Sequence, residues 1–161
     1  MAFIQLESPV GRIEIQGDDQ AVSGLVIERD GLLPGDGLKA ESSPVLDLAA
    51  KQVEEYFAGD REDFELPLAL GGTEFQRRVW ARIAAIPAGS ATTYGEIGRE
   101  IGLGPAGRAI GGAVGANPVP LIIPCHRVLA SNGKITGYSA GEGIATKRWL
   151  LEHEGVLLAA G

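Results

Sequence analysis

The segment Pro124-Cys125-His126-Arg127-Val128 holds the only cysteine of this 161-residue chain and one of its two histidines. It follows an apolar run, residues 119–123, that predicts a short buried strand. A thiol beside an imidazole suits nucleophilic chemistry, because the thiolate is the reactive form and a nearby base can generate it. A lone cysteine is also a common small core residue, and neighbouring side chains on a strand point to opposite faces. The pair alone leaves both interpretations open.

The composition limits the class of protein. The chain is 45% hydrophobic and 22% charged, which is enough apolar content for a folded core. A single cysteine excludes an internal disulfide, and one cysteine with two histidines, of which His153 is distant in sequence, is a poor set of zinc ligands. We therefore expect no metal and no cofactor. Without a leader peptide or an apolar run of membrane-spanning length, we expect a cytoplasmic protein with no membrane partner.

The net charge of −7 is unevenly distributed. Residues 1–71 carry 5 basic and 15 acidic side chains, whereas residues 72–161 carry 9 basic and 6 acidic ones. An acidic first part with a mildly basic second part is a weak indication of a phosphate-bearing partner for the second part. The alternative interpretation is that these charged residues form ordinary solvated surface.

Residues 1–71 predict a small N-terminal α/β domain with an antiparallel sheet. Alternating apolar residues and a turn at residues 8–11 predict a hairpin, followed by a third strand and a loop over residues 30–42. Ser43 and Pro44 form a helix start, with apolar residues at helical spacing behind them. The expected strands are residues 3–6, 12–15, 24–27 and 64–70, and the expected helical face is Val45, Leu48, Ala49, Val53 and Tyr56.

Gly71-Gly72 marks the boundary to a second domain, residues 72–161, which is mainly helical by pattern. A capping box at residues 73–76 starts one helix, which also carries three arginines that suit either solvent or phosphate. A second capping box at residues 93–96 starts a short helix, and a Gly-containing turn leads to another at about residues 105–115. This arrangement predicts a helix-turn-helix.

The second helix of that motif consists almost entirely of small residues, and Arg108 is its only charge. Each glycine in a helix costs about 1 kcal/mol relative to alanine. A helix that keeps so many glycines is expected to have something large close to its backbone, either a neighbouring helix or a nucleic-acid groove. Beyond it the sequence predicts a break at Asn117-Pro118, a turn at residues 131–134, a loop over residues 136–141 and a last helix from about Gly143 to Gly155.

Taken together, these motifs make the second half resemble the O6-alkylguanine-DNA alkyltransferases, also called methylated-DNA–protein-cysteine methyltransferases. The matching segments, in chain order, are Gly72-Thr73-Glu74-Phe75-Gln76, Val79-Trp80, Ile86-Pro87, Thr93-Tyr94-Gly95, Arg108-Ala109, Asn117-Pro118, Ile123-Pro124-Cys125-His126-Arg127-Val128, Gly137-Tyr138, Leu150-Leu151 and Glu154-Gly155. The resemblance implies a ribonuclease-H-like first domain and a winged helix-turn-helix-like second domain. The match of the first part is looser and rests on position and length.

The resemblance implies a suicide reaction. Cys125 would take an alkyl group from O6 of guanine, with O4 of thymine as a further candidate, and keep it as a thioether. His126 would act as base through a bound water, and Glu154 would orient the imidazole. Asn117 would shape the turn near the thiol, and Tyr94 would donate to the leaving guanine. The substrate pocket implied by the resemblance comprises Tyr138, Ser139, Ala140, Pro120 and Lys147.

The resemblance also implies double-stranded DNA as partner, bound through the minor groove by a protein expected to be a monomer, with cooperative binding left open. The alkylated nucleotide would be flipped out, and Arg108 would fill its place in the stack. The implied DNA-contacting residues are Arg108, Tyr94, Thr93, Ala106, Gly107, Ala109, Gly111 and Arg127.

Three departures from the family pattern stand out. Ala140 replaces a common glycine and is expected to narrow the pocket, Pro105 is shifted by one residue relative to Arg108, and residues 1–71 lack the ligands for a zinc site found in some relatives.

One alternative function is a non-catalytic protein that binds alkylated DNA; such proteins carry tryptophan at the cysteine position, which Cys125 contradicts. A second alternative is a cysteine hydrolase, which requires an oxyanion hole and repeated turnover.

Overall fold

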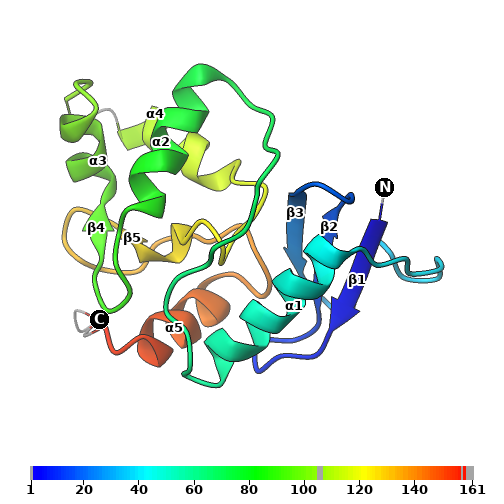
Figure 1. The fold of residues 1–161 in the computed structure, drawn as a ribbon. Coiled ribbons are helices and arrows are strands. Elements are labelled where there is room, and N and C mark those ends of the chain that lie inside the picture. The colour runs from blue at the N-terminus through cyan, green and yellow to red at the C-terminus, as the bar shows by residue number, and fades with distance from the viewer. Residues whose placement is uncertain (1, 105–106, 157, 159–161) are drawn as a thin grey trace. The chain divides into compact units, whose positions relative to one another are not determined.

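The computed structural model describes residues 2–104, 107–156 and 158 and consists of two compact units (Figure 1). The first unit is Met1–Gly71 together with Ala140–Glu142, and the second is Gly72–Ser139 together with Gly143–Gly161. The sequence did not predict that the short segment 140–142 groups with the first unit. Two hydrogen bonds hold it there: Arg29 Nε donates to the Gly141 carbonyl (2.7 Å), and the Asp30 amide donates to the Glu142 carboxylate (2.9 Å).

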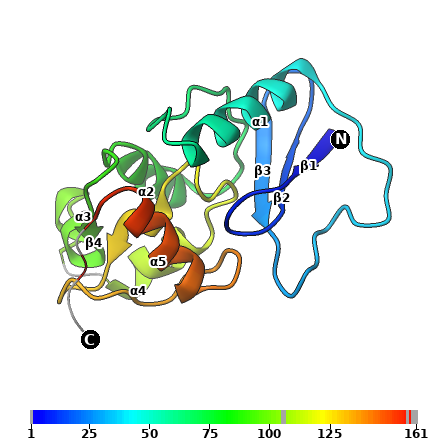
Figure 2. The same cartoon turned by 90° about the horizontal axis from the view of Figure 1, so that it is seen from below.

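The first unit is an antiparallel sheet with one helix, as the sequence predicted, and the sheet has three strands. Its strands β1 (Ala2–Leu6), β2 (Ile13–Gly17) and β3 (Val22–Ile27) follow one another in the order β1-β2-β3. The helix α1 (Pro44–Phe57) packs along this sheet in both views (Figures 1 and 2). The apolar core between them is formed by Ile13, Ile15, Val22, Leu25, Ile27, Leu46, Ala49, Val53 and Tyr56.

Helix α1 starts where the sequence predicted. The Leu46 amide donates to Ser43 Oγ (3.2 Å), which satisfies one of the free amides of the first turn. Pro44 stands at the first helical position, where its missing N–H costs nothing. The buried face differs from the prediction in one respect: Leu46 is fully buried, whereas Leu48 is 43% exposed.

The strand predicted for residues 64–70 is wrong. This segment makes only a single bridge, in which the Val22 amide donates to the Pro67 carbonyl and the Ala69 amide donates to the Val22 carbonyl, each at 2.9 Å. Pro67 has no N–H to extend the ladder, which limits the pairing to one residue.

The first unit also buries a polar cluster that fixes the loop after β3. Glu14 is 1% exposed, and its carboxylate accepts hydrogen bonds from Gln5 (2.9 Å), Gln16 (2.6 Å) and the Gly35 amide (2.7 Å). Nearby, Arg12 pairs with Glu28 (2.9 Å) and Asp36 (2.8 Å). The Arg12 guanidinium holds the pKa of the Asp36 carboxyl well below its usual range.

The second unit is mainly helical, as predicted. It comprises α2 (Glu74–Ala84), α3 (Tyr94–Glu100), α4 (Gly107–Gly115) and α5 (Ile144–His153), with a small parallel pair of β4 (Thr92–Thr93) and β5 (Val128–Leu129). The capping box of α2 is complete, because Thr73 and Gln76 each accept from the other's backbone amide (3.0 and 2.9 Å). Trp80 of α2 donates to the Ala113 carbonyl of α4 (2.8 Å) and so joins these two helices.

The capping box predicted for α3 is only half formed. The Glu96 amide donates to Thr93 Oγ1 (3.1 Å), but the Glu96 side chain pairs with Arg99 one turn further on. Helices α3 and α4 pack against each other as the helix-turn-helix pattern predicted. The predicted start of the second helix at Pro105 lies outside the described residues.

The strand predicted for residues 119–123 is also wrong, although the segment is buried as expected. Its chain turns at Leu121, which has a positive φ of 79°, and the Ile123 amide donates to the Val119 carbonyl (3.0 Å). Pro118 and Pro120 lack the amides that a strand ladder needs, so the segment folds as a turn. A short 3₁₀ helix, Cys125–Arg127, follows and leads into β5.

None of the helices in the part of the chain that the structure describes combines the length and apolar character needed to cross a bilayer.

Candidate functional site

The parallel pairing of β4 with β5 brings two distant segments together. Thr92 pairs with Val128 and Thr93 with Leu129. Tyr94 follows β4 directly, and the 3₁₀ helix with Cys125 directly precedes β5. This short sheet of threonine, valine and leucine residues therefore positions both the Cys125 thiol and Tyr94.

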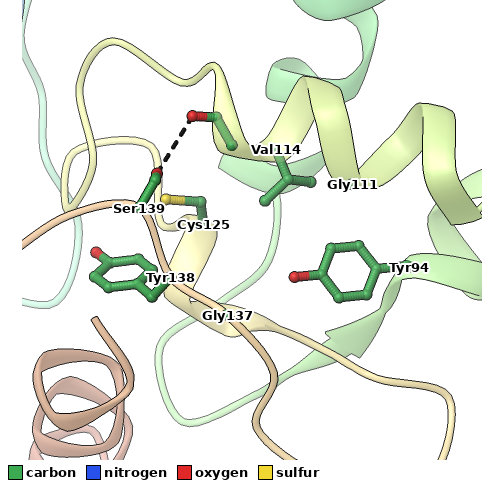
Figure 3. A pocket seen from close by; sticks show the side chains of 8 residues that line it. Tyr94, Gly111, Val114, Cys125, Gly137, Tyr138 and Ser139 are labelled. Carbon is green, nitrogen blue, oxygen red and sulfur yellow. Dashed lines mark hydrogen bonds between the residues drawn. The ribbon is translucent and has the colours of Figure 1, made fainter.

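Both residues line a cavity of about 350 Å³ in the second unit (Figure 3). This volume lies within the range of small-ligand sites, about 300–1,000 Å³. In Figure 3 the hydroxyl end of Tyr94 points into the cavity, with Cys125 and Tyr138 across from it. The lining residues are Tyr94, Gly111, Val114, Gly115, Cys125, Gly137, Tyr138 and Ser139.

The Cys125 thiol is 3% exposed. Burial raises its pKa, because a thiolate loses hydration in an apolar surrounding. The Asn117 side chain, the charge of Lys147 and the Tyr138 side chain act in the opposite direction and favour the thiolate. The resting residue is a thiol that needs a base to become reactive.

A candidate base, His126, lies next to it and is fully buried. Its Nε2 is 2.7 Å from Glu154 Oε2, and the Glu154 side chain is 2% exposed. Burial lowers the pKa of His126 in spite of the carboxylate, which favours a neutral imidazole that can accept a proton. Nδ1 has no hydrogen-bond partner among the described residues, which suits a bound water between imidazole and thiol.

Arg127 requires a correction. We predicted a DNA contact, but the residue is 3% exposed and its guanidinium binds within the unit. Nε and Nη2 donate to the two oxygens of Glu154 (2.7 and 3.0 Å), and Nη1 donates to the Ile86 carbonyl (2.6 Å). A guanidinium held in this way cannot reach a phosphate; it fixes the carboxylate that contacts His126.

Asn117 holds the turn before the cysteine. Its Nδ2 donates to the Ile123 carbonyl (2.8 Å), and its Oδ1 accepts from the Val119 amide (3.0 Å). Both groups of the amide are used, so the side chain determines where the 3₁₀ helix begins.

The predicted pocket residues are only partly brought together. Tyr138 and Ser139 line the cavity, and Ser139 Oγ donates to the Gly115 carbonyl (3.3 Å). Pro120 and Lys147 are buried and do not line it. Ala140 is buried in the first unit rather than lining the cavity, so the expectation that it narrows the pocket is not supported.

Lys147 does not line the cavity and is 1% exposed. Its Nζ donates to the Val128 carbonyl (2.7 Å) and, at 3.5 Å, to the Gly137 carbonyl. The ammonium also lies 6.0 Å from the centre of the Tyr94 ring. Burial lowers its pKa to about 8.

Helix α4 presents a bare outer face. Gly107, Arg108 and Ala109 are exposed. A Cβ added at Gly107, Gly111, Gly112 or Gly115 would meet no atom within 4 Å among the described residues. A neighbouring helix therefore does not explain these glycines. Ala106, predicted to contact DNA, lies outside the described residues.

Other polar residues of the second unit have partners inside it. Arg77 donates to the Gly72 carbonyl (3.0 Å), Arg78 to the Ile101 carbonyl (3.0 Å), and Arg82 pairs with Glu100. These contacts favour the structural interpretation of the arginines on α2. Thr93, predicted to contact DNA, uses its hydroxyl as the cap of α3.

Sequence reasoning missed three cavity residues, Val114, Gly115 and Gly137. The first two share a helical face with Gly111, at a spacing of three and four residues, so helical periodicity could have found them. Gly137 carries no such signal. Over residues 2–104, 107–156 and 158, no group of three His, Cys, Asp or Glu side chains could hold a metal ion.

Comparison with known proteins gives a consistent result over both units. Residues 74–156 match the DNA binding domain of 6-O-methylguanine DNA methyltransferase, and residues 1–70 match its ribonuclease-like domain. A methylated-DNA–protein-cysteine methyltransferase from Methanosarcina acetivorans is 40% identical, over 96% of this chain and 99% of the relative.

Solved structures agree. Mycobacterium tuberculosis OGT in complex with DNA superposes with a TM-score of 0.84 at 38% identity, covering 96% of this chain and 92% of that one. An O6-methylguanine DNA methyltransferase from Methanococcus jannaschii gives a TM-score of 0.68 at 28% identity, covering 99% and 96%.

Proposed function

The chain belongs to the 6-O-methylguanine DNA methyltransferase family, and we propose that it repairs DNA by moving the alkyl group of O6-alkylguanine irreversibly onto its own Cys125. The observation that carries this proposal is the placement of the only thiol of the chain at a cavity, next to a buried imidazole–carboxylate pair. Residues 72–161 would then form the DNA-binding and alkyl-transfer domain.

The chemistry follows from the protonation states. His126 takes the thiol proton through a bound water, and Glu154 stabilises the resulting imidazolium. The sulfur lone pair of Cys125 then forms a bond to the alkyl carbon, while the bond from that carbon to O6 breaks and its electron pair stays on the guanine. A proton from Tyr94 neutralises the departing base, and the thiol proton held by His126 then replaces the one that Tyr94 lost, so that no net charge remains. Ser139 lies on the same cavity wall to contact O6.

The reaction occurs once per molecule. A thioether is stable, and the chain has no second thiol that could restore Cys125. The protein is therefore consumed stoichiometrically and needs no cofactor. O4-alkylthymine offers the same kind of alkyl carbon and is a second substrate to test.

Helix α4 would meet the DNA. Its glycines face open space, so a duplex backbone can approach closely, and the small residues suit the narrow minor groove. The reacting carbon is inaccessible within a duplex, so the nucleotide must be flipped out, at a cost of a few kcal/mol. Arg108, exposed on this face, would occupy the vacated place. A monomer would suffice for these steps.

The test is a stoichiometric reaction with a duplex that contains one O6-methylguanine. We expect the methyl group to leave the DNA and the intact mass of the protein to increase by one methyl group and no more, even with excess DNA. Repeated turnover would favour a hydrolase, and binding without any mass change would favour a non-catalytic DNA-binding protein.

A further inference from the structure

Lys147 is a buried cation whose partners are all uncharged. Its contacts are the carbonyls of Val128 and Gly137 and the ring of Tyr94. Across the described residues it forms no ion pair with a carboxylate. Burying an ammonium without an anion is costly, so such a residue calls for an explanation.

Arg127, in the same unit, shows the usual arrangement of a buried cation, which is paired with a carboxylate. It is nearly as buried as Lys147, but both oxygens of Glu154 compensate its charge. Glu154 is thereby committed to Arg127 and His126. The fold thus provides an anion for one buried cation and not for the other.

Among the described residues, the titratable groups that interact with Lys147 are Cys125, His126 and Tyr94. Cys125 is the one that must become an anion before the alkyl group moves, whereas Tyr94 gives up its proton only to the departing base. The charge of Lys147 favours the thiolate of Cys125 and, in turn, the Cys125 anion favours the charged amine. The same charge disfavours an imidazolium at His126.

We propose that Lys147 is the built-in counter-ion of the Cys125 thiolate, a positioning residue whose missing anion is supplied by the reaction itself. This inference rests on the proposed function. When the thiol proton passes to His126, the new negative charge on sulfur lies in the field of the Lys147 ammonium. The sulfur lone pair then bonds to the alkyl carbon, the bond from that carbon to O6 breaks, and Lys147 neither gains nor loses an atom.

The hydrogen bond from Nζ to the Val128 carbonyl fixes the position of the ammonium near the segment that carries Cys125. Val128 lies three residues after Cys125 in the same turn-and-strand segment, and the Gly137 carbonyl belongs to the cavity wall. The ammonium is thus fixed to two backbone carbonyls, one in the segment that carries the thiol and one in the cavity wall. A merely structural lysine would hold these carbonyls without changing the acidity of the thiol.

The first experiment measures the rate at which iodoacetamide alkylates Cys125 as a function of pH, in wild type and in Lys147→Met, Lys147→Arg and Lys134→Met. We expect Lys147→Met to raise the apparent pKa of the thiol by one unit or more, which lowers the thiolate fraction about tenfold at neutral pH. Lys147→Arg should restore most of the shift. Lys134 is exposed on the turn at residues 131–134, so Lys134→Met should match wild type.

Transfer from O6-methylguanine DNA should slow in parallel with the iodoacetamide rate at each pH. If the pH profile of Lys147→Met coincides with that of wild type, the counter-ion role is wrong. Since iodoacetamide does not involve DNA, a normal Lys147 effect without any methyl transfer would contradict the proposed function alone.

A second measurement leaves Lys147 in place, in case Lys147→Met does not fold. The side-chain NMR signal of Lys147 is titrated in wild type and in Cys125→Ser. Because coupling between two sites is reciprocal, the thiolate should keep Lys147 charged to higher pH in wild type than in the variant. Superimposable titration curves would overturn the proposal.

Discussion

Each unit contains a buried glutamate and a notable arginine, but these side chains have different partners in the two units. Glu14 in the first unit accepts from neutral amides, whereas Glu154 in the second contacts an imidazole beside the thiol. Arg12 pairs with two carboxylates of its own unit, whereas Arg108 is exposed on helix α4. The polar residues of the first unit hold a loop in place, whereas in the second unit Glu154 supports the imidazole beside the thiol and Arg108 is exposed to solvent.

The largest expected effect comes from the thiol itself. Cys125→Ser should abolish methyl transfer, because an alcohol at this position is a far weaker nucleophile than a thiolate. DNA affinity should stay near that of wild type, since Cys125 is buried. Transfer assays and DNA titrations measure the two properties; residual transfer at the wild-type rate would place the acceptor elsewhere.

The buried carboxylates give the sharpest contrast between the units. Glu154→Gln should slow transfer by about 100-fold or more, as expected when a general base loses its support. Glu14→Gln should leave the transfer rate unchanged and lower the free energy of unfolding by about 1–3 kcal/mol, because it disturbs a buried hydrogen-bonded cluster.

Rates per folded molecule and denaturant titrations measure both variants. The comparison fails if Glu14→Gln slows transfer as much as Glu154→Gln, since the carboxylate beside the imidazole would then have no special role.

The arginines form a second matched pair. Arg108→Ala should slow transfer from duplex DNA about tenfold, because one stacking contact is worth about 1–3 kcal/mol, while stability stays unchanged. Arg12→Ala should lower stability through the loss of its pairs with Glu28 and Asp36 and leave transfer unaffected. Equal slowing of Arg108→Ala on duplex DNA and on free O6-methylguanine would argue against a role in nucleotide flipping.

Acidification should weaken the second unit before the first. The pKa of His126 is lowered in the folded protein, so below its ordinary value of 6.5 the unfolded chain takes up a proton that the folded unit resists. The free energy of unfolding should therefore decrease as the pH drops below 6.5, by about 1.4 kcal/mol per pH unit at most. In the first unit the lowered pKa values of Asp36 and Glu28 delay the corresponding loss to more acidic pH.

Both tryptophans, Trp80 and Trp149, belong to the second unit, so their fluorescence follows its unfolding selectively. A fluorescence-detected stability that stays constant from pH 7.5 to about pH 5 would mean that His126 is not held neutral by burial.

The smallest effects concern the glycines. Gly112→Ala should leave stability equal or raise it by up to about 1 kcal/mol, because its Cβ points into open space, yet weaken DNA binding a few-fold. Gly35→Ala should lower stability and leave DNA binding unchanged, since a Cβ there would lie 2.4 Å from the Phe3 ring and 2.6 Å from Glu14. If Gly112→Ala binds DNA as wild type does, the outer face of α4 is not the contact surface.

Sequence patterns correctly predicted those features that depend on residues close together in the chain. Ser43 and Thr73 were identified as helix caps because the capping hydrogen bonds span only three residues. The strand expected at residues 119–123 failed because apolar content predicted burial, while Pro118 and Pro120 prevented a ladder.

The site residues divide in the same way. Cys125 and His126 could be singled out from their adjacency and rarity, whereas Arg127 was assigned to DNA because its true partner, Glu154, is distant in sequence. The role proposed for Lys147 rests on the lack of a carboxylate partner among the described residues, which no sequence pattern reports.

The most direct test of the account is peptide mapping by tandem mass spectrometry after reaction with excess O6-methylguanine duplex. We predict a single methyl group on the peptide that contains Cys125, at one equivalent per protein, and none in Cys125→Ser. A methyl group on any other residue, or loss of methyl from the DNA with an unmodified Cys125, would contradict the account.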